Sequence, residues 1–534
     1  MALSKILSGA IFGIDAFCVE VETDAGMTGD PQIVIVGLPD AAVRESQYRV
    51  SSAVTNSGYE PFRGRITVNL APADIRKEGP FFDLPIAMGI LTASGALEQD
   101  SGKRRRKPGQ PPPRELTPMD LDGVAMIGEL SLAGEVRRVR GVLPIAMKLK
   151  ESGITTFLVP EENAAEAAVV DGLTVYPIRS LRQAAQLITG EDTITKPARA
   201  SLDQIYNEHD YSLEPDFAEV KGQEMAKRAI EIAVAGGHNI LMVGPPGTGK
   251  SMLARRIPSI LPQMTLDEAL EVTKIHSIAG LLPSSEPLLF TRPFRAPHHT
   301  ISDAGLLGGG SHPTPGEVTL SHLGVLFLDE LPEFHRSVLE VMRQPLEDGT
   351  VTISRVAGSS LFPCRFILVA AMNPCPCGYY GDANRPCRCS SMQIKNYRSR
   401  ISGPLLDRID IHIQVPATKF QDLQSIPEGE TSTKMRETVI KARGIQTERF
   451  AGKRKILLNA MMGRREIEKY CFLNEETREV LSFAMNDMHF SPRAHDRILK
   501  VARTIADIDN SPDILPIHLQ EALQYRTLDR TMWV

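Results

Sequence analysis

A glycine-rich segment followed by a lysine and a hydroxyl side chain carries the clearest chemistry in this sequence. Its residues, in chain order, are Gly244, Pro245, Pro246, Gly247, Thr248, Gly249, Lys250 and Ser251. They fit the pattern G-x-x-x-x-G-K-[ST], in which backbone N–H groups surround phosphate oxygens and the lysine contacts the β- and γ-phosphates. The apolar run Ile240–Val243 precedes the segment and helix-forming residues 251–257 follow it. The segment therefore predicts a strand–loop–helix site for ATP, with Ser251 as a ligand of Mg²⁺.

Polar residues also end two other apolar runs. Asp329 and Glu330 follow Val325–Leu328, and Asn373 follows residues 366–372. Ligands of open α/β sheets bind at the carboxyl ends of the strands, so we expect these side chains beside the phosphates. Asp329 is predicted to hold Mg²⁺ and Glu330 to polarise the attacking water. Asn373 either orients that water or contacts the γ-phosphate, or it is only a turn residue.

An arginine lies in the run Leu-Leu-Asp-Arg-Ile-Asp, residues 405–410. At this place Arg408 could stabilise transition-state charge on a nucleotide held by a neighbouring subunit. The alternative is a surface cluster of salt bridges, which is the commoner reason for such a run of charges.

Four of the seven cysteines lie in one short segment. They form two C-x-C pairs separated by nine residues: Cys375, Cys377, Cys387 and Cys389. Four thiolates can hold Zn²⁺ tetrahedrally, although the pairs are one residue tighter than the usual C-x₂-C. Reduced free thiols and an iron–sulfur cluster are the alternatives. A metal here would stiffen the loop after Asn373, or it would support a small knuckle that contacts DNA.

The wider pattern of the chain predicts three regions that position these residues. Residues 1–190 alternate strand-like and helical runs, which predicts a mixed α/β domain with a basic, proline-rich surface insertion at 101–118. A polar linker covers 191–215. Near-continuous apolar strands in 216–425 favour a parallel sheet covered on both faces. Residues 434–534 have helical periodicity throughout.

Composition excludes several classes of protein. The 534 residues are 42% hydrophobic and 23% charged, which is typical of a globular chain and excludes disordered, collagen-like and coiled-coil proteins. A net charge of −5 excludes a globally basic nucleic-acid binder but leaves room for a local basic strip. No run approaches the ~20 apolar residues of a membrane span, and the start lacks a signal peptide, so we expect no membrane association and a cytoplasmic location.

Taken together, these motifs resemble an AAA+ ATPase, and within that class the ComM/YifB group of magnesium-chelatase-like proteins. The resemblance covers the chain apart from 101–118. It rests on residues 37–46, 68–74, 292–299, 328–334, 372–378, 402–410 and 501–507. Members of this group are bacterial DNA-dependent ATPases involved in branch migration during natural transformation, so the resemblance implies a hexameric ring that acts on DNA.

The resemblance also implies roles for single residues. Lys250 and Ser251 match the Walker A motif, Asp329 and Glu330 match Walker B, and Asn373 matches the first sensor. Arg408 matches the arginine finger that acts in trans. Arg493, in the helical region, matches a second sensor.

Two insertions within the ATPase region resemble the pore loops of related motors. They are residues 291–312 and a hairpin arm at 347–355. His298, His299 and His312 fall in the first insertion, where a pore-loop or structural role is favoured over a metal site.

The first region resembles the Lon-protease-like, S5 domain 2-like fold. The resemblance rests on Arg76-Lys-Glu-Gly-Pro-Phe-Phe-Asp83, in which Phe81 stands where the proteolytic members carry a nucleophilic serine. A phenylalanine cannot form an acyl-enzyme, so we predict the fold without peptidase activity.

These expectations combine into an ATP-dependent DNA motor that acts on single-stranded, forked or branched DNA. Three alternatives stay open at this point: a metallochelatase motor subunit, an ATP-dependent protease, which Phe81 opposes, and an ATP-dependent assembly chaperone that does not act on DNA.

Overall fold

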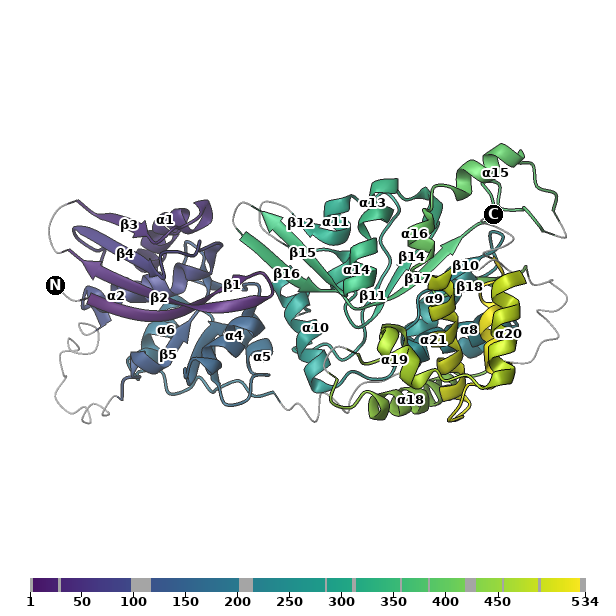
Figure 1. The fold of residues 1–534 in the computed structure, drawn as a ribbon. Coiled ribbons are helices and arrows are strands. Elements are labelled where there is room, and N and C mark those ends of the chain that lie inside the picture. Colours follow the sequence, from purple (N-terminus) through teal and green to yellow (C-terminus); the bar gives the residue numbers. More distant parts are fainter. Residues whose placement is uncertain are drawn as a thin grey trace. The chain divides into compact units, whose positions relative to one another are not determined.

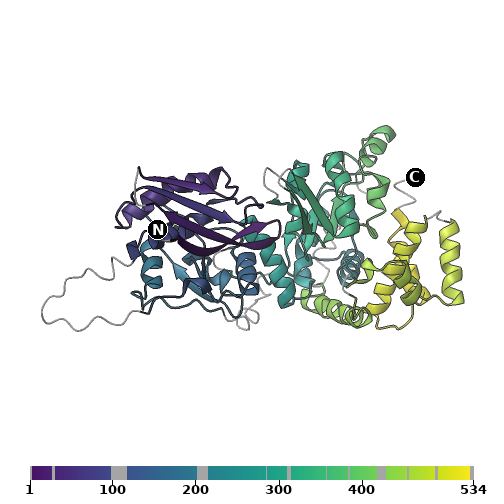
Figure 2. The same cartoon turned by 60° about the vertical axis from the view of Figure 1, so that its left-hand side comes forward.

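The computed structural model describes eleven stretches of the chain (Figures 1 and 2). They are residues 3–26, 30–97, 117–200, 215–283, 286–309, 314–355, 358–382, 385–417, 429–453, 456–487 and 491–528. Most of the predicted insertion at 101–118 and of the linker at 191–215 lies outside them. The chain divides into two compact units. The first contains Met1–Glu208, Ala269–Leu289 and Ser354–Ser360, and the second contains the remainder. The division into three domains stays a prediction.

The first unit is built on a seven-stranded mixed sheet. In spatial order its strands are β3 (Gln32–Val36), β4 (Arg65–Ala71), β2 (Asp15–Ala25), β1 (Leu3–Phe12), β5 (Val124–Met126), β8 (Thr156–Pro160) and β9 (Thr174–Ile178). β1 and β2 pair antiparallel along their whole length, from Leu3 opposite Asp24 to Phe12 opposite Asp15. The other half, from β1 to β9, is parallel. The predicted mixed α/β architecture is confirmed.

Helices complete the first unit. They are α1 (Ala41–Asn56), α2 (Asp83–Ala93), α4 (Val142–Glu151), α5 (Glu161–Ala167), α6 (Leu181–Ile188) and most of α10 (Leu266–Ala279). Ten of the eleven residues of α2 are buried, which is why its sequence is apolar all round. Its one charged residue, Asp83, accepts from Arg49 Nε at 2.7 Å and Nη2 at 3.0 Å and from the Leu130 N–H at 3.1 Å. The buried carboxylate is thus fully partnered, as burial of a charge requires.

The second unit is built on a five-stranded parallel sheet. Its order is β11 (Phe294–Arg295), β14 (Val325–Leu328), β17 (Ile367–Met372), β10 (Ile240–Val243) and β18 (Ile411–Gln414). Every residue of β10, β14 and β17 is buried. Strands with both faces covered can be apolar at each position, which explains the near-continuous hydrophobic runs in the sequence.

Helices surround this sheet and fill the C-terminal region. Those before residue 410 are α8 (Glu224–Gly236), α9 (Lys250–Arg256), α11 (Asp303–Leu307), α12 (Glu317–Leu320), α13 (Arg336–Val341), α14 (Arg343–Asp348), α15 (Ser391–Arg398) and α16 (Gly403–Leu406). The C-terminal ones are α18 (Ser432–Arg449), α19 (Arg464–Tyr470), α20 (Glu475–Asp487), α21 (Pro492–Ile508) and α22 (Pro516–Gln524). They confirm the helical C-terminal prediction. One hydrophobic core joins them to the sheet, with Val369 of β17, Ile230 of α8 and Ile505 of α21 among its buried members.

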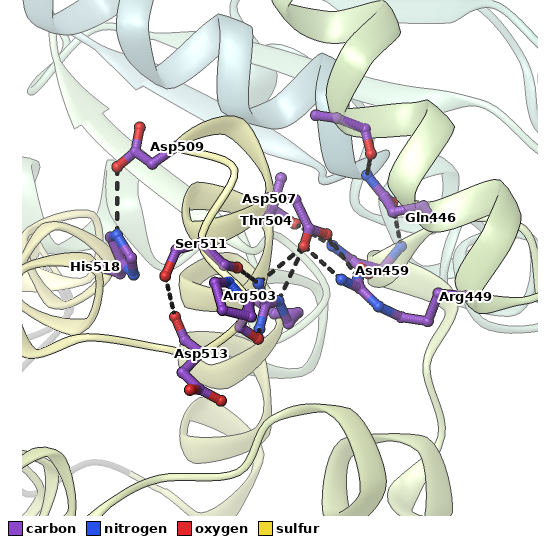
Figure 3. A network of polar contacts seen from close by, with 12 residues as sticks. Gln446, Arg449, Asn459, Arg503, Thr504, Asp507, Asp509, Ser511, Asp513 and His518 are labelled. Carbon is purple, nitrogen blue, oxygen red and sulfur yellow. Dashed lines mark hydrogen bonds and ion pairs between the residues drawn. The ribbon is translucent and has the colours of Figure 1, made fainter.

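A buried polar network fixes the C-terminal helices to one another (Figure 3). The Asp507 carboxylate is fully buried and pairs with the guanidinium groups of Arg449 and Arg503. Asn459 donates to the same carboxylate at 2.8 Å and to Thr504 Oγ1 at 3.1 Å. Two arginines and an amide compensate the desolvation of one carboxylate, so α18 and α21 are held by directional contacts as well as by apolar packing.

Two short two-stranded sheets lie within residues 308–363. β15 (Thr350–Arg355) and β16 (Gly358–Pro363) form one of them, so only the first strand falls in the arm predicted at 347–355 and the second strand lies beyond it. In the predicted insertion at 291–312, β12 (Gly308–Gly309) pairs with β13 (Thr314–Pro315), while His312 lies outside the described residues. Among the described residues, none of the helices has the length and apolarity that crossing a membrane requires.

Candidate nucleotide-binding site

Three neighbouring strands end in the polar residues singled out by the sequence. β17 lies between β10 and β14, with Val243 opposite Met372 and Leu328 opposite Ala370. The chain continues from these strands into Gly244, Asp329 and Asn373. The parallel register therefore brings the glycine-rich loop, the acidic pair and the asparagine to one edge of the sheet, as expected for a ligand site in an α/β fold.

The glycine-rich loop leaves β10 and enters α9. Gly247 and Gly249 have φ values of +80° and +87°. A Cβ at either position would meet nothing within 4 Å, so the backbone conformation alone calls for glycine there. Gly244 has a different reason, because a Cβ would lie 2.2 Å from the Val415 carbonyl oxygen. The loop thus combines left-handed turns with a close backbone approach, ahead of the N-terminus of α9.

Lys250 is the buried cation of the site. Its ammonium donates to the carbonyl oxygens of Gly244 at 2.7 Å and Pro245 at 2.8 Å, and it lies 3.3 Å from Asn373 Oδ1. Burial lowers the pKa of Lys250, while Asp329 and Glu330 oppose that shift. A cation held in this partly dehydrated position interacts more strongly with phosphate than an exposed lysine does.

Ser251 and Asp329 meet directly, with the Ser251 hydroxyl donating to Asp329 Oδ2 at 2.6 Å. A hydroxyl and a carboxylate are hard oxygen ligands of the kind that Mg²⁺ takes from proteins when it also binds phosphates. Two oxygens from neighbouring elements therefore lie where the sequence predicted a Mg²⁺ site.

Glu330 directly follows Asp329, one of the two predicted Mg²⁺ ligands. The backbone of Glu330 is in the left-handed region, at φ +52°. Its N–H donates to Asp329 Oδ1 at 2.9 Å, and its carboxylate is about half exposed, 3.7 Å from His299 Nδ1. A non-glycine residue at positive φ is uncommon and occurs at functional sites. The sequence did not predict the His299 contact, because the histidine precedes Glu330 by 31 residues and only the adjacency of β11 and β14 brings the two chain segments together.

Asn373 is held from two sides. Its side-chain oxygen faces Lys250, and its backbone is hydrogen-bonded to Tyr397 of α15. Burial, followed by the charge of Glu333, raises the pKa of Tyr397, so its hydroxyl stays protonated. These contacts place the Asn373 side chain at the phosphate-binding lysine, and its role as a sensor stays a prediction.

The two predicted arginines each form an ion pair with a carboxylate. Arg408 pairs with Glu347 and donates to the Pro404 carbonyl oxygen at 2.7 Å. Arg493, about two-thirds exposed at the start of α21, lies 3.5 Å from the carboxylate of Asp407, the residue before Arg408. In the described part of the chain, neither arginine forms a hydrogen bond or ion pair with Lys250, Ser251 or Asp329.

Comparison with known proteins gives matches along the whole chain. The family model of the magnesium chelatase subunit ChlI matches residues 216–423, and the model of its C-terminal part matches 429–526. A further model, subunit ChlI of Mg-chelatase, matches 19–105 and 114–163.

Competence protein ComM of Haemophilus influenzae is 42% identical over 537 residues, covering 100% of this chain and 99% of that protein. YifB of Escherichia coli is 40% identical, covering 100% of this chain and 98% of the relative. The chain belongs to the ComM/YifB group of magnesium-chelatase-like AAA+ proteins. Lon protease 2 of Bacillus subtilis is 29% identical over 193 residues, covering 30% of this chain and 32% of that protein.

In this ComM/YifB-type chain the turn that resembles a protease site is filled by an aromatic ring. Gly79 has φ +88°, and a Cβ there would lie 2.7 Å from Phe81 Cε1. The Phe81 ring lies 4.8 Å from that of Phe82, centroid to centroid. Phe81 is thus partly buried and packs beside Phe82 at this turn.

The four clustered cysteines of this family member converge in space. The sulfur of Cys375 lies 3.4 Å from that of Cys377 and 3.6 Å from that of Cys387, and Cys377 and Cys387 are also 3.6 Å apart. With Cys389, all four sulfurs lie within 4.8 Å of one another. Hydrogen bonds from the backbone, first at Arg388 and then at Tyr379, lower the pKa of Cys377 to about 6. The cluster is compatible with a structural Zn²⁺ site, whose ligands are thiolates.

Proposed function

We propose that this chain is an ATP hydrolase that works as a ring-shaped DNA motor in the cytoplasm. The observation that carries the proposal is the convergence of Lys250, Ser251, Asp329 and Glu330 at one edge of a parallel sheet. Membership of an AAA+ family supports nucleotide binding and oligomerisation.

The residues at the sheet edge divide the work of phosphoryl transfer. Backbone groups of residues 244–251 bind the phosphates, and Lys250 offsets charge on the β- and γ-phosphates. Ser251 and Asp329 would hold Mg²⁺, which supplies further charge neutralisation when bound. Glu330 accepts a proton from the attacking water, and Asn373 orients that water against the γ-phosphate.

Arg408 completes the site of a neighbouring subunit in this proposal, and Arg493 acts as the second sensor from the helical lid. Arg408 pairs with Glu347 and Arg493 with Asp407, and neither is bonded to the phosphate-binding residues of its own subunit among the described contacts. A surface that offers an arginine to the next nucleotide generates head-to-tail contacts, which close into a ring. We propose a hexamer, from the resemblance stated above.

DNA as the substrate rests on the relatives. The Haemophilus influenzae protein is named a competence protein. We propose that this chain likewise translocates single-stranded, forked or branched DNA and migrates branches of recombination intermediates in natural transformation. The 347–355 arm and the 291–312 insertion are the proposed DNA-gripping loops.

The remaining structural assignments belong to the same proposal. Residues 1–190 adopt a Lon-protease-like fold without peptidase activity, 216–425 form the ATPase core and 434–534 the helical lid. Cys375, Cys377, Cys387 and Cys389 hold a structural Zn²⁺.

ATPase measurements with different DNA forms test the proposal. We expect hydrolysis to rise severalfold with single-stranded or forked DNA and the particle to reach hexameric mass with ATP. An Arg408→Ala chain should bind ATP but hydrolyse it about 10³-fold more slowly, since a trans arginine contributes on this scale. Mixing it with Lys250→Ala chains should restore some mixed-site turnover. ATPase activity indifferent to every DNA form would refute the DNA motor.

A second candidate follows from the family models, which are those of a magnesium chelatase subunit. A chelatase motor subunit would assist insertion of Mg²⁺ into a tetrapyrrole together with partner subunits. The same assay separates the two, because tetrapyrrole and partner subunits, instead of DNA, would then raise the ATPase rate.

A further inference from the structure

The cysteine loop, residues 375–389, contacts the phosphate-binding loop directly. Gly378 lies between the two cysteine pairs and has φ +87°. A Cβ at this position would lie 2.6 Å from Pro246 Cδ and 3.0 Å from Pro246 Cγ. The backbone of the cysteine loop is therefore in van der Waals contact with the second proline of the phosphate-binding loop, and only glycine permits that approach.

The first cysteine is also tied to the other side of the nucleotide site. Cys375 is fully buried and follows Asn373 by two residues. Asn373 in turn lies 3.3 Å from the Lys250 ammonium. Between them, the Pro374 carbonyl oxygen accepts from Arg398 Nε of α15 at 3.2 Å. A displacement of Cys375 would be transmitted to Asn373 through a single intervening residue.

The geometry of the sulfurs fits a tetrahedral ion. Zn–S bonds of about 2.3 Å in a tetrahedron separate the sulfurs by about 3.8 Å. Three of the sulfur–sulfur separations are 3.4, 3.6 and 3.6 Å, and the whole set lies within 4.8 Å. Gly381, at φ +79°, and the turn from the Gly378 N–H to the Cys375 carbonyl oxygen at 2.9 Å bring the two pairs together.

The described part of this loop is irregular. Cys377, Cys387 and Cys389 are partly exposed, and the described residues between Met372 and Ser391 form no helix or strand. A short irregular segment of this kind gains order from a metal more than from packing, because metal binding offsets the entropy of the loop.

We infer that Zn²⁺ on Cys375, Cys377, Cys387 and Cys389 acts as a clamp on the nucleotide site: it sets the position of Gly378 against Pro246 and of Asn373 against Lys250, so that ATP affinity depends on the zinc. The inference rests on nucleotide binding in the proposed function and not on DNA as the substrate. If the clamped arrangement is populated only about a tenth of the time without zinc, the apparent Kd rises about tenfold.

The experiment compares zinc content with nucleotide affinity in the full chain. Freshly purified protein should contain about one zinc per chain by atomic emission, the stoichiometry of a four-thiolate site. The probe is an N-methylanthraniloyl derivative of ATP, followed by fluorescence in the presence of Mg²⁺. Stripping zinc with a chelator and a thiol-reactive reagent that is later reversed should raise its Kd about tenfold, and adding ZnCl₂ back should restore it.

Three variants separate the clamp from a general loss of folding. Cys387→Ser should lose zinc and affinity together, whereas Cys18→Ser, a cysteine of the first unit, should keep both. Gly378→Ala leaves all four ligands, so it should retain zinc and still weaken binding about fivefold, because its Cβ displaces Pro246.

The zinc content and the Kd for the ATP derivative together either support or contradict the clamp. Stoichiometric zinc with a zinc-dependent Kd supports the clamp. Absence of zinc from the purified protein, or an unchanged Kd after stripping, would overturn it. If Cys387→Ser fails to fold, which circular dichroism reveals, the strip-and-restore measurement on the unaltered chain still decides. None of these measurements contains DNA, so a failure of the DNA-motor proposal leaves them unaffected.

Discussion

Each of the two units contains a glycine with positive φ that leads into a helix. The residues that follow the two glycines differ in kind. Gly79 has φ +88° and Gly249 has φ +87°. Two residues later the first turn carries Phe81 and the second carries Ser251. A Cβ at Gly79 would strike the Phe81 ring at 2.7 Å, whereas one at Gly249 would meet nothing within 4 Å.

The difference shows that a backbone turn alone does not make a reactive site. Beside Gly249 lie a cation and a hydroxyl from the start of α9, and two carboxylates and an amide from the residues after β14 and β17. Beside Gly79 the polar groups serve structure: Asp40 accepts from the Gly79 N–H at 3.2 Å, and Asp83 pairs with Arg49. We therefore expect changes in the second turn to alter nucleotide chemistry and changes near the first to alter stability alone.

Lys250→Ala should have the largest effect. Removing the buried ammonium withdraws charge that binds the phosphates and stabilises the transition state, so kcat/KM for ATP should fall by about 10⁴-fold or more. The measurement is steady-state ATPase together with nucleotide binding. Lys434→Ala, on an exposed lysine of the same unit, is the control and should match the unaltered chain. Near-normal turnover in the Lys250 variant would contradict the assignment of the site.

Glu330→Gln should lower kcat by about 10³-fold while ATP stays bound, because the amide cannot accept the proton of the attacking water. Single-turnover hydrolysis and a binding titration distinguish the two effects. Glu333→Gln is the matched control, since Glu333 lies three residues further along and its carboxylate pairs with the exposed Arg400 at 2.9 Å. Equal losses in both variants would indicate a damaged loop and not a lost base.

Asp83→Asn should change stability in the first unit without changing chemistry in the second. The substitution leaves Arg49 without its buried counter-charge, and such breakage costs about 3 kcal/mol. Denaturant unfolding measures the loss, and the Kd for nucleotide should stay constant. Glu45→Gln, at 3.9 Å from Arg49 and exposed, should cost about 0.5 kcal/mol or less. If the Asp83→Asn variant also lost ATP binding, the expectation that this turn affects stability alone would be wrong.

Phe81→Ser should have the smallest effect, and it is the sharpest test of the first turn. It installs a hydroxyl at the position of a nucleophile but supplies no general base, so we expect no digestion of casein with or without ATP. The half-buried ring is lost at a cost of about 1–2 kcal/mol in unfolding free energy. Phe81→Leu, which keeps an apolar side chain, should cost less. ATP-dependent digestion by either variant would show that the peptidase machinery persists.

Much of the fold could be predicted from local patterns in the sequence. The continuous apolar runs Ile240–Val243 and Val325–Leu328 became β10 and β14 with the same bounds, since strands buried on both faces leave a one-dimensional signal. The helical character of residues 434–534 was predicted from their helical periodicity, and the structure adds capping residues such as Ser491 before α21. The roles of the individual site residues stay predictions.

The contacts across the site could not be predicted in the same way. His299 beside Glu330, Tyr397 behind Asn373, and Arg493 beside Asp407 join residues separated by 31, 24 and 86 positions. Such pairs depend on strand order and on how helices pack, and neither leaves a periodic trace in the sequence.

By itself the sequence determined which chemical groups the protein can bring to a site. A phosphate-binding turn, a pair of carboxylates and an amide each follow an apolar strand, and four thiols lie close together in the chain. Only the tertiary structure decided how these groups meet. The order β14–β17–β10 set the acids and the amide beside the lysine, and the approach of Gly378 to Pro246 joined the thiol cluster to the phosphate-binding loop. The physical reason is that side-chain types and turns are encoded by neighbours in the chain, whereas distances across a sheet are fixed by the packing of the whole core.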